Sequence, residues 1–284
     1  MNAREADSRT EEACRLCGGG TMPAFSAKIL DRYQVPFYVC GTCGSLQSET
    51  PYWLDEAYQD AIVATDTGAV RRSVICHTAI ACIATILKAR GRVLDFGGGT
   101  GLLCRLLRDR GFDAYVSDKY AEPVYAREFV LNLKEVVPGS IGLLSAIEVF
   151  EHCAHPAREI GQLFAVRPQV LVATTVPYRG EKADWWYIGA RAGQHVFFFS
   201  PAGLRMLAEQ HGYHYVGVRD FHVFSRAPIS GARRLALQLL LSKWGLRAAS
   251  VWMTATQRTG HSEADFRYLC DKLASGPEAA RSKK

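Results

Sequence analysis

The sequence lacks a long apolar run, an apolar leader and internal repeats. Its longest apolar stretch, from Thr78 to Leu87, is shorter than the ~18 to 20 residues that a membrane span needs. The first thirteen residues carry too many charges for the apolar segment of a signal peptide. With 48% hydrophobic and 22% charged residues among 284, the composition is that of a globular protein, either one large domain with appendages or two domains. We therefore expect a chain that neither spans a membrane nor is secreted.

Nine cysteines occur without a secretory signal, which indicates a reducing, cytoplasmic compartment. Four of them form two C-x-x-C pairs, Cys14 with Cys17 and Cys40 with Cys43, separated by 22 residues. Two such pairs around an intervening hairpin can place four thiolates tetrahedrally about one Zn²⁺. Because a closed four-sulfur site leaves no open position for a substrate, we expect a structural zinc ribbon without catalytic activity.

The formal net charge of +6 is concentrated near the C-terminal end. Residues 226–284 hold eleven Lys and Arg against four Asp and Glu, so they carry +7 and the other residues together carry −1. This region is either a solvated basic tail or a surface that attracts phosphates or makes peripheral contact with anionic lipid.

Strand and helix patterns alternate from Arg92 to about Arg226. Strand-like segments such as RVLDF and IGLLSAI are separated by helical segments such as LLCRLLRDRG. Alternation of this kind is typical of an α/β fold with a Rossmann-like, doubly wound and mostly parallel sheet. We accordingly divide the chain into a zinc-ribbon module (1–50), a helical linker or lid (51–90), a Rossmann-like core (91–226) and a basic helical C-terminal region (227–284).

Four glycines follow the first strand of this core, in the segment RVLDFGGGTGLLCRLL. Glycines without Cβ atoms let the backbone approach a ligand closely, and the N-terminus of the next helix offers free N–H groups. A nicotinamide-type G-x-G-x-x-G would require glycine at Leu102, whereas this chain has G-x-G-x-G at Gly97, Gly99 and Gly101. The alternative is a tight turn that binds nothing.

The glycine spacing, preceded by Asp95, resembles motif I of the class I S-adenosylmethionine (SAM)-dependent methyltransferases. The resemblance covers about residues 70–225. It implies that Asp95 lies near the amino group of SAM and that the glycine loop passes beneath its methionine and ribose portions. Asp118, at the tip of the next strand, can accept hydrogen bonds from both ribose hydroxyls, as an acid at this position does in dinucleotide folds. We therefore expect the core to bind SAM.

A second motif, E-x-x-E-H, follows the strand IGLLSAI. Glu148, Glu151 and His152 stand at i, i+3 and i+4, so one helical turn would place them on a single face. Two carboxylates and an imidazole can hold a divalent cation such as Mg²⁺ or Mn²⁺. The pattern is similar to that of the ubiquinone-pathway O-methyltransferases and the small-RNA 2′-O-methyltransferases. That resemblance implies a further histidine ligand after the next strand, for which His195 is the candidate.

Three interpretations of this motif stay open. In the first, Glu148, Glu151, His152 and His195 hold a divalent cation. In the second, Glu148 contributes to the cofactor pocket, while Glu151, His152 or His195 acts in catalysis, with a histidine as the general base. In the third, the E-H pair only caps a helix, as it does in many class I methyltransferases.

The segment that follows the strand QVLVATTV is dense in aromatic residues, including Trp185, Trp186 and Tyr187. Aromatic faces can stack on a sugar ring or a base, or attract the sulfonium of SAM. They can equally anchor a long loop by apolar packing. Because Trp185 and Trp186 stand in a polar, glycine-flanked stretch, we expect them to line the substrate.

The cysteine pairs also resemble the N-terminal zinc domain of bacterial deoxysugar methyltransferases, which act on nucleotide-linked sugars. The large C-terminal domain of those enzymes has no counterpart here, which leaves open whether carbon or oxygen is methylated. The segments DWWYIGARAGQHVFFFS and PYWLDEAY are similar to shorter methyltransferases associated with surface-polysaccharide synthesis.

We therefore expect a SAM-dependent enzyme that O-methylates a sugar in a nucleotide-activated or polysaccharide precursor, with a small molecule or glycan as acceptor. One rival is an RNA methyltransferase in which the ribbon and the basic tail bind phosphates. The first 50 residues argue against it, because they hold five Lys and Arg against six Asp and Glu. A second rival is a SAM-binding scaffold protein without activity, which the glycine loop, Asp118 and the E-x-x-E-H motif make a poor fit.

Overall fold

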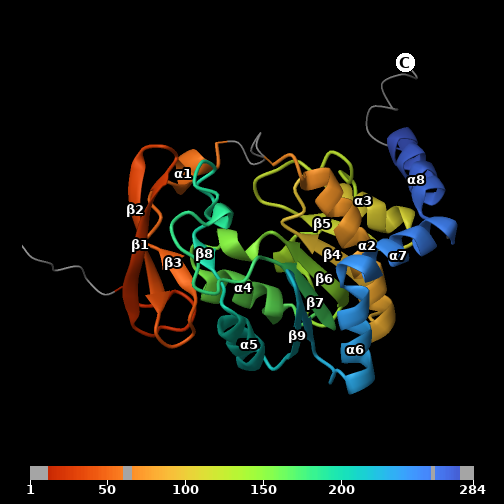
Figure 1. The fold of residues 1–284 in the computed structure, drawn as a ribbon. Coiled ribbons are helices and arrows are strands. Elements are labelled where there is room, and N and C mark those ends of the chain that lie inside the picture. The colour runs from red at the N-terminus through yellow and green to blue at the C-terminus, as the bar shows by residue number, and fades with distance from the viewer. Residues whose placement is uncertain (1–11, 60–65, 257–259, 276–284) are drawn as a thin grey trace, which may run out of the picture. The chain divides into compact units, whose positions relative to one another are not determined.

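The computed structural model describes residues 12–59, 66–256 and 260–275 (Figure 1). These residues form two compact units. Unit 1 comprises residues 12–59, Glu148–Gln162 and Thr175–His211, and unit 2 comprises the other described residues. Each unit is therefore assembled from separate stretches of chain. The division at residues 50, 90 and 226 stays a prediction.

Unit 2 is built on a six-stranded sheet in the order β5-β4-β6-β7-β10-β9. β4 pairs in parallel with β5 and β6, and β6 with β7, whereas β10 runs antiparallel to both β7 and β9. The strands are β4 (Arg92–Phe96), β5 (Ala114–Ser117), β6 (Ile141–Ile147), β7 (Val170–Thr174), β9 (His214–Val218) and β10 (Phe221–Ser225). The parallel strands with helices between them confirm the predicted Rossmann-like α/β fold.

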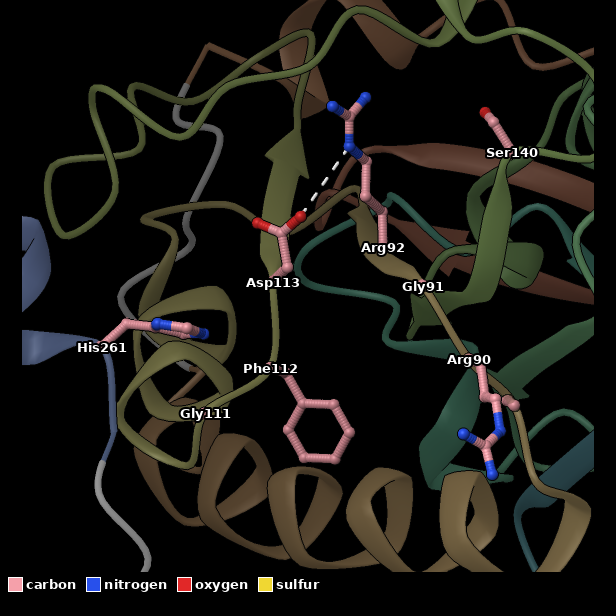
Figure 2. A pocket seen from close by; sticks show the side chains of 9 residues that line it. Arg90, Gly91, Arg92, Gly111, Phe112, Asp113, Ser140 and His261 are labelled. Carbon is pink, nitrogen blue, oxygen red and sulfur yellow. Dashed lines mark ion pairs between the residues drawn. The ribbon is translucent and has the colours of Figure 1, made fainter.

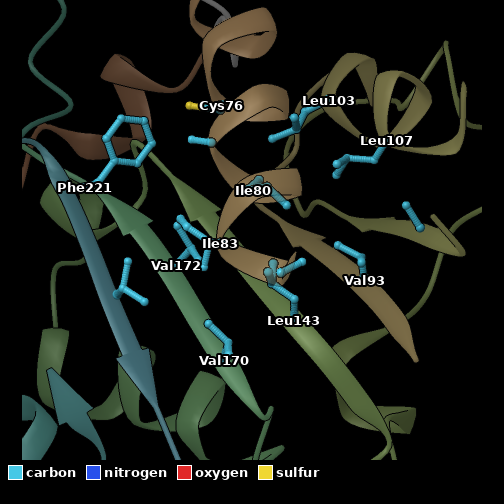
Figure 3. Packing of buried hydrophobic residues seen from close by; sticks show 14 of the residues in the cluster. Cys76, Ile80, Ile83, Val93, Leu103, Leu107, Leu143, Val170, Val172 and Phe221 are labelled. Carbon is cyan, nitrogen blue, oxygen red and sulfur yellow. The ribbon is translucent and has the colours of Figure 1, made fainter. Parts of the chain in front are cut away.

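Helices cover both faces of this sheet. On one face, Ile80 and Ile83 of α2 (Ala69–Leu87) pack in a core with strand residues such as Leu143 (Figure 3). α3 (Leu102–Asp109) adds Leu103 and Leu107 to the same core. On the other face, Phe164 of α4 (Pro156–Ala165) meets the ring of Phe224 edge-on at 5.4 Å between centroids. Successive strand residues face opposite sides of a sheet. Val223 of β10 therefore packs in the core with α2, whereas Phe224 packs against α4 on the other face.

α2 also has the length and composition of a membrane span, with 19 residues and a mean hydropathy of 1.5. It is longer than the apolar stretch that begins at Thr78 because the helix starts at Ala69. A core helix meets the same two criteria, and Cys76, Ile80 and Ile83 lie in the core described above.

The C-terminal part of unit 2 is helical, as the sequence predicts. It forms α6 (Gly231–Leu240), α7 (Lys243–Ala255) and α8 (Ser262–Ser275), and a short 3₁₀ helix, η1 (Leu133–Glu135), lies earlier in the unit. The Arg108 guanidinium of α3 holds α8 through two hydrogen bonds to Asp265, of 2.7 and 2.6 Å. The predicted basic region includes residues 257–259 and 276–284, which lie outside the described residues.

Unit 1 contains a four-stranded antiparallel sheet in the order β1-β2-β3-β8. Its strands are β1 (Thr21–Ile29), β2 (Tyr33–Cys40), β3 (Leu46–Ser48) and β8 (Phe197–Phe198), and its helices are α1 (Leu54–Ala57), η2 (Phe150–His152), η3 (Trp186–Ile188) and α5 (Pro201–Gln210). The β1–β2 hairpin lies between the two cysteine pairs, as their spacing predicts. β8 pairs with β3 through Leu46 and Phe198, so the aromatic segment after β7 joins the sheet of the cysteine hairpin.

Candidate functional site

The glycine loop of unit 2 has a backbone that side chains would disrupt. Gly97, Gly99 and Gly101 all have positive φ angles, of 68°, 53° and 76°. A Cβ atom on Gly98 would lie 2.4 Å from Oδ2 of Asp95, and one on Gly101 would lie 2.9 Å from the Cβ atom of Ala126. A Cβ atom on Gly99, in contrast, would meet nothing within 4 Å. The loop is therefore tightly packed behind and open in front of Gly99.

Two carboxylates flank this loop. Asp95 is buried in β4, where Oδ1 accepts a hydrogen bond of 2.8 Å from Ser145 and Oδ2 has no hydrogen-bond partner among the described residues. Burial raises the pKa of Asp95 to about 7. Asp118, after β5, accepts hydrogen bonds from the backbone N–H groups of Gly99, at 2.8 Å, and Tyr120, at 2.7 Å. Asp118 thus shapes the loop, while Asp95 offers a buried oxygen to a cationic partner.

A cavity of about 800 Å³ also lies in unit 2, but at the opposite end of the strands (Figure 2). Arg92, the first residue of β4, lines this cavity, whereas the glycine loop follows Phe96, the last residue of β4. Arg92 forms an ion pair of 3.8 Å with Asp113 beside this cavity. Ligands of open α/β sheets bind at the carboxyl ends of the strands, so this cavity is not the expected cofactor site.

The four predicted zinc ligands come together in unit 1. Cys14, Cys17, Cys40 and Cys43 have ligand atoms within 4.8 Å of one another. Sulfur–sulfur distances are 3.7 Å between Cys14 and Cys43 and 3.5 Å between Cys17 and Cys40. A zinc tetrahedron with ~2.3 Å bonds has edges of about 3.8 Å, whereas a disulfide bond is only about 2.05 Å long. The donor set and its spacing therefore fit a tetrahedral zinc ion.

A second group of potential metal ligands in unit 1 consists of Glu151, His152 and His195. One ligand atom from each lies within 4.8 Å of the others, and the two imidazole centroids are 4.8 Å apart. Two ligands on opposite sides of an ion with ~2.2 Å bonds would be about 4.4 Å apart. The three side chains need only small shifts to share one ion, so this donor set fits a hard or borderline divalent cation.

Two tyrosines outside the E-x-x-E-H motif orient this group. The Tyr58 hydroxyl lies 3.0 Å from Nδ1 of His152. The Tyr187 hydroxyl donates a hydrogen bond of 2.7 Å to Glu151, whose side chain is fully buried. His195 donates from Nδ1 to the Tyr187 carbonyl at 2.6 Å, so the lone pair of its neutral ring is on Nε2. No motif joins Tyr58 to His152 across 94 positions, and only the aromatic segment indicated Tyr187.

Glu148 differs from the prediction that one helical turn carries all three motif residues. Its φ is +53°, and the 3₁₀ helix η2 begins only at Phe150. Among the described residues, Glu148 is therefore outside the group formed by Glu151, His152 and His195. Its carboxylate instead lies 3.4 Å from the Tyr187 hydroxyl.

Arg15, between the first two cysteines, connects the ribbon to the acid–histidine group, which consists of Glu151, His152 and His195. Its guanidinium donates hydrogen bonds to the carbonyls of Val196, at 2.8 Å, and Ser48, at 3.0 Å. The N–H of Val196 donates in turn to the Glu151 carbonyl at 2.9 Å. Burial lowers the pKa of Arg15 to about 10, which still leaves it charged at neutral pH. The two predicted metal sites of unit 1 are thus linked through one half-buried arginine.

The two tryptophans predicted to line the substrate, Trp185 and Trp186, lie in different environments. Trp185 packs against Tyr187 and Phe198, with centroid distances of 5.4 and 5.3 Å, and belongs with the core of unit 1. Trp186 is 75% exposed, and its ring lies 5.2 Å from that of Tyr187. Of the two tryptophans, Trp186 alone presents most of its surface outward.

A family model described as a methyltransferase domain matches residues 70–218, more than half of the chain. Among solved structures, the magnesium protoporphyrin IX methyltransferase of Synechocystis PCC 6803, with bound SAH, is 16% identical, with a TM-score of 0.41 over 61% of this chain and 93% of that one. TnmH is 19% identical, with a TM-score of 0.45 over 62% of each chain. The 1,6-didemethyltoxoflavin-N1-methyltransferase of Burkholderia thailandensis is 13% identical, with a TM-score of 0.42 over 61% and 83%. No curated protein sequence matches the chain.

Proposed function

The chain belongs to the methyltransferase-domain family and is a SAM-dependent methyltransferase, and we propose that it O-methylates a sugar hydroxyl in a nucleotide-activated or polysaccharide precursor. The grouping of Glu151, His152 and His195 carries this proposal, because methylation of a hydroxyl requires removal of its proton. We place the enzyme in the cytoplasm, where its cysteines stay reduced and can bind zinc.

We assign cofactor binding to Asp95, Gly97, Gly99, Gly101, Asp118 and Glu148. SAM, when bound, supplies an electrophilic methyl group and an ammonium group. The buried Oδ2 of Asp95 suits the ammonium, since it is otherwise a carboxyl oxygen without a hydrogen-bond partner among the described residues. The open space at Gly99 suits a close approach of backbone to ligand. Asp118 accepts hydrogen bonds from the N–H groups of Gly99, Tyr120 and Ala121, which leaves one lone-pair position on Oδ2 for a ribose hydroxyl.

We assign acceptor activation to Glu151, His152 and His195. A divalent cation such as Mg²⁺ or Mn²⁺, when bound by these side chains, would lower the pKa of the acceptor hydroxyl. Without a cation, Nε2 of His195 or a nitrogen of His152 takes the hydroxyl proton directly as a general base. Glu148 is the more distant member of the motif, and its carboxylate contacts the Tyr187 hydroxyl, so we do not assign it direct metal ligation.

A sugar acceptor is supported by the exposed ring of Trp186 beside Tyr187. An indole face presented in this way can cover the apolar face of a pyranose while the hydroxyl groups remain available to polar residues. The zinc ion at Cys14, Cys17, Cys40 and Cys43 has a structural role in this proposal. It would fix the backbone around Arg15. Through the hydrogen bond of Arg15 to the Val196 carbonyl, it would also fix the residue that follows His195.

The test measures methyl transfer from labelled SAM to nucleotide-linked sugars, to polysaccharide precursors and to RNA. The enzyme is first treated with a chelator mild enough to leave one zinc per chain, as checked by elemental analysis. Activity should fall with the chelator and return with Mg²⁺ or Mn²⁺. Glu151→Gln and His195→Gln should each lower kcat by about 100-fold or more and keep SAM affinity. His155→Gln, at an exposed position outside the group, is the matched control.

The outcomes separate the alternatives. Activity that resists the chelator but requires His152 or His195 would replace the cation with a simple base. Activity that survives both glutamine substitutions would remove Glu151 and His195 from catalysis. Transfer to RNA but to no sugar would reject the proposed acceptor class.

A further inference from the structure

The helices α6 and α7 present an apolar surface outward that the proposed catalytic function does not use. On α7, the inward face consists of Leu246, Ala249 and Met253, which are buried. On the opposite side, Trp244, Val251 and Trp252 are 73%, 72% and 62% exposed. Their spacing of seven and eight residues keeps them on one side of the helix. α7 is therefore apolar on both its inner and its outer side.

The preceding helix repeats this arrangement. Leu237 of α6 is buried in the core of unit 2, whereas Leu235 and Leu239, four residues apart, are 56% and 64% exposed. Leu241 and Ser242 alone separate the two helices, which follow one another in blue in Figure 1. Five large apolar side chains are therefore exposed on two consecutive helices.

The charged residues within and next to these two helices in the sequence have one sign. Residues 221–262 contain six Lys and Arg and no Asp or Glu. Lys243 and Arg247 flank the apolar side chains of α7, and the Arg247 guanidinium lies 5.1 Å from the centre of the Trp244 ring. Among the residues that the structure describes, no carboxylate forms an ion pair with Lys243 or Arg247. The cations thus stay available to an anionic partner.

We propose that the outer face of α6 and α7, with Trp244, Val251 and Trp252 at its centre, docks on an anionic lipid surface. Exposed tryptophans on α7 and exposed leucines on α6, bordered by Lys and Arg, match a bilayer interface, where rings enter the headgroup region and cations meet lipid phosphates. A second copy of the chain fits less well, because a two-fold contact through this face would oppose like charges. RNA would satisfy the cations but offers no apolar phase to Val251 or Leu239.

The experiment compares the binding of the full chain to vesicles of phosphatidylcholine alone and of phosphatidylcholine with 30% phosphatidylglycerol, by co-sedimentation. Binding to the anionic vesicles should be about tenfold stronger or more and should weaken at high salt. The double variants Trp244→Ser/Trp252→Ser and Lys243→Glu/Arg247→Glu should each lower it by about tenfold or more. The second variant should also show a weaker salt dependence.

Matched controls lie on α8, where carboxylates accompany the exposed apolar residues. Phe266→Ser replaces a ring of similar exposure, and Arg267→Glu reverses a cation that pairs with Glu263. Both should bind vesicles within about twofold of the wild type. Circular dichroism and SAM titration verify that every variant is folded.

Three results would overturn the proposal. The first is equal binding to neutral and anionic vesicles, or none to either. The second is a dimer in sedimentation velocity that Trp244→Ser/Trp252→Ser converts to monomer while vesicles are not bound. The third is salt-sensitive binding to RNA without any binding to vesicles. None of these results bears on the acceptor assay, so the membrane proposal and the catalytic proposal can fail separately.

Discussion

The glycine loop of unit 2 and the acid–histidine group of unit 1 obtain their geometry in different ways. The loop is one stretch of chain, held by its own backbone and by Asp118, 19 positions after Gly99. The acid–histidine group gathers side chains from η2 and from the segment before β8, and Tyr187 of η3 and Tyr58 near α1 support it. Because SAM is always the same molecule, it can be bound by a fixed backbone loop. An acceptor that differs between enzymes is better met by side chains on separate segments, because each can be replaced without disturbing the loop.

The largest effect that would test this contrast is expected from the zinc ribbon. Cys40→Ser should release the zinc, since it removes one of four ligands, and should disturb Arg15 and the Val196 backbone. We expect methyl transfer to fall by at least about 100-fold while SAM still binds, because the glycine loop belongs to unit 2. Elemental analysis, limited proteolysis and calorimetric SAM titration measure the three quantities.

Cys270→Ser is the control for this substitution, since Cys270 is an exposed thiol on α8. It should leave zinc content and activity unchanged. If Cys40→Ser keeps its zinc, the ribbon assignment is wrong. If it loses SAM affinity together with zinc, the two units do not function as separately as their residues indicate.

The converse experiment changes the loop. Gly99→Leu forces a residue with a Cβ atom to a φ of +53° and fills the open space in front of the loop. We expect SAM affinity to fall by about 100-fold or more, with zinc content unchanged. Gly180→Leu, at another glycine with positive φ and open surroundings, is the matched control and should keep SAM affinity. Unchanged calorimetric affinity for SAM in Gly99→Leu would remove the loop from the cofactor site.

The same contrast explains what the sequence could predict. Asp95, the glycines and Asp118 are signalled by one contiguous segment, so both the α/β fold and the loop could be anticipated from spacing. The cysteine pairs were equally local. The contacts of Tyr58 with His152 and of Arg15 with Val196 join residues 94 and 181 positions apart, and no local pattern encodes them. The positive φ of Glu148 was also hidden, because i, i+3, i+4 spacing predicts a helical face only where a helix forms.

A smaller effect concerns pH and the loop carboxylate. Burial raises the pKa of Asp95 to about 7, so the free protein carries a neutral Asp95 below this pH and a carboxylate above it. The ammonium of SAM favours the carboxylate, so affinity should fall by up to about tenfold per pH unit below 7. Because the folded pKa exceeds the ordinary value of 3.8, the stability contributed by this group is full below pH 3.8 and is lost as the pH rises through 7.

Calorimetric titration between pH 6 and 7.5 tests this dependence, with Asp95→Asn as the matched variant. The asparagine cannot ionise, so its weaker affinity should not vary across this range, and its unfolding temperature should lose the same pH dependence. A wild-type affinity that is constant from pH 6 to 7.5 would separate Asp95 from the ammonium of SAM.

The smallest expected effect is that of Tyr187→Phe, which removes one hydroxyl from the acid–histidine group and leaves the ring. Burial raises the pKa of Tyr187 well above its ordinary value, so the hydroxyl remains a donor to Glu151 at any working pH. Its loss leaves the buried carboxylate with one donor fewer, at a cost of about 1 kcal/mol. We therefore expect kcat to fall by about fivefold to tenfold at neutral pH. SAM affinity should not change, because Tyr187 belongs to unit 1 and the loop to unit 2. A kcat equal to that of the wild type would mean that the hydrogen bond from Tyr187 to Glu151 does not contribute to the transfer step.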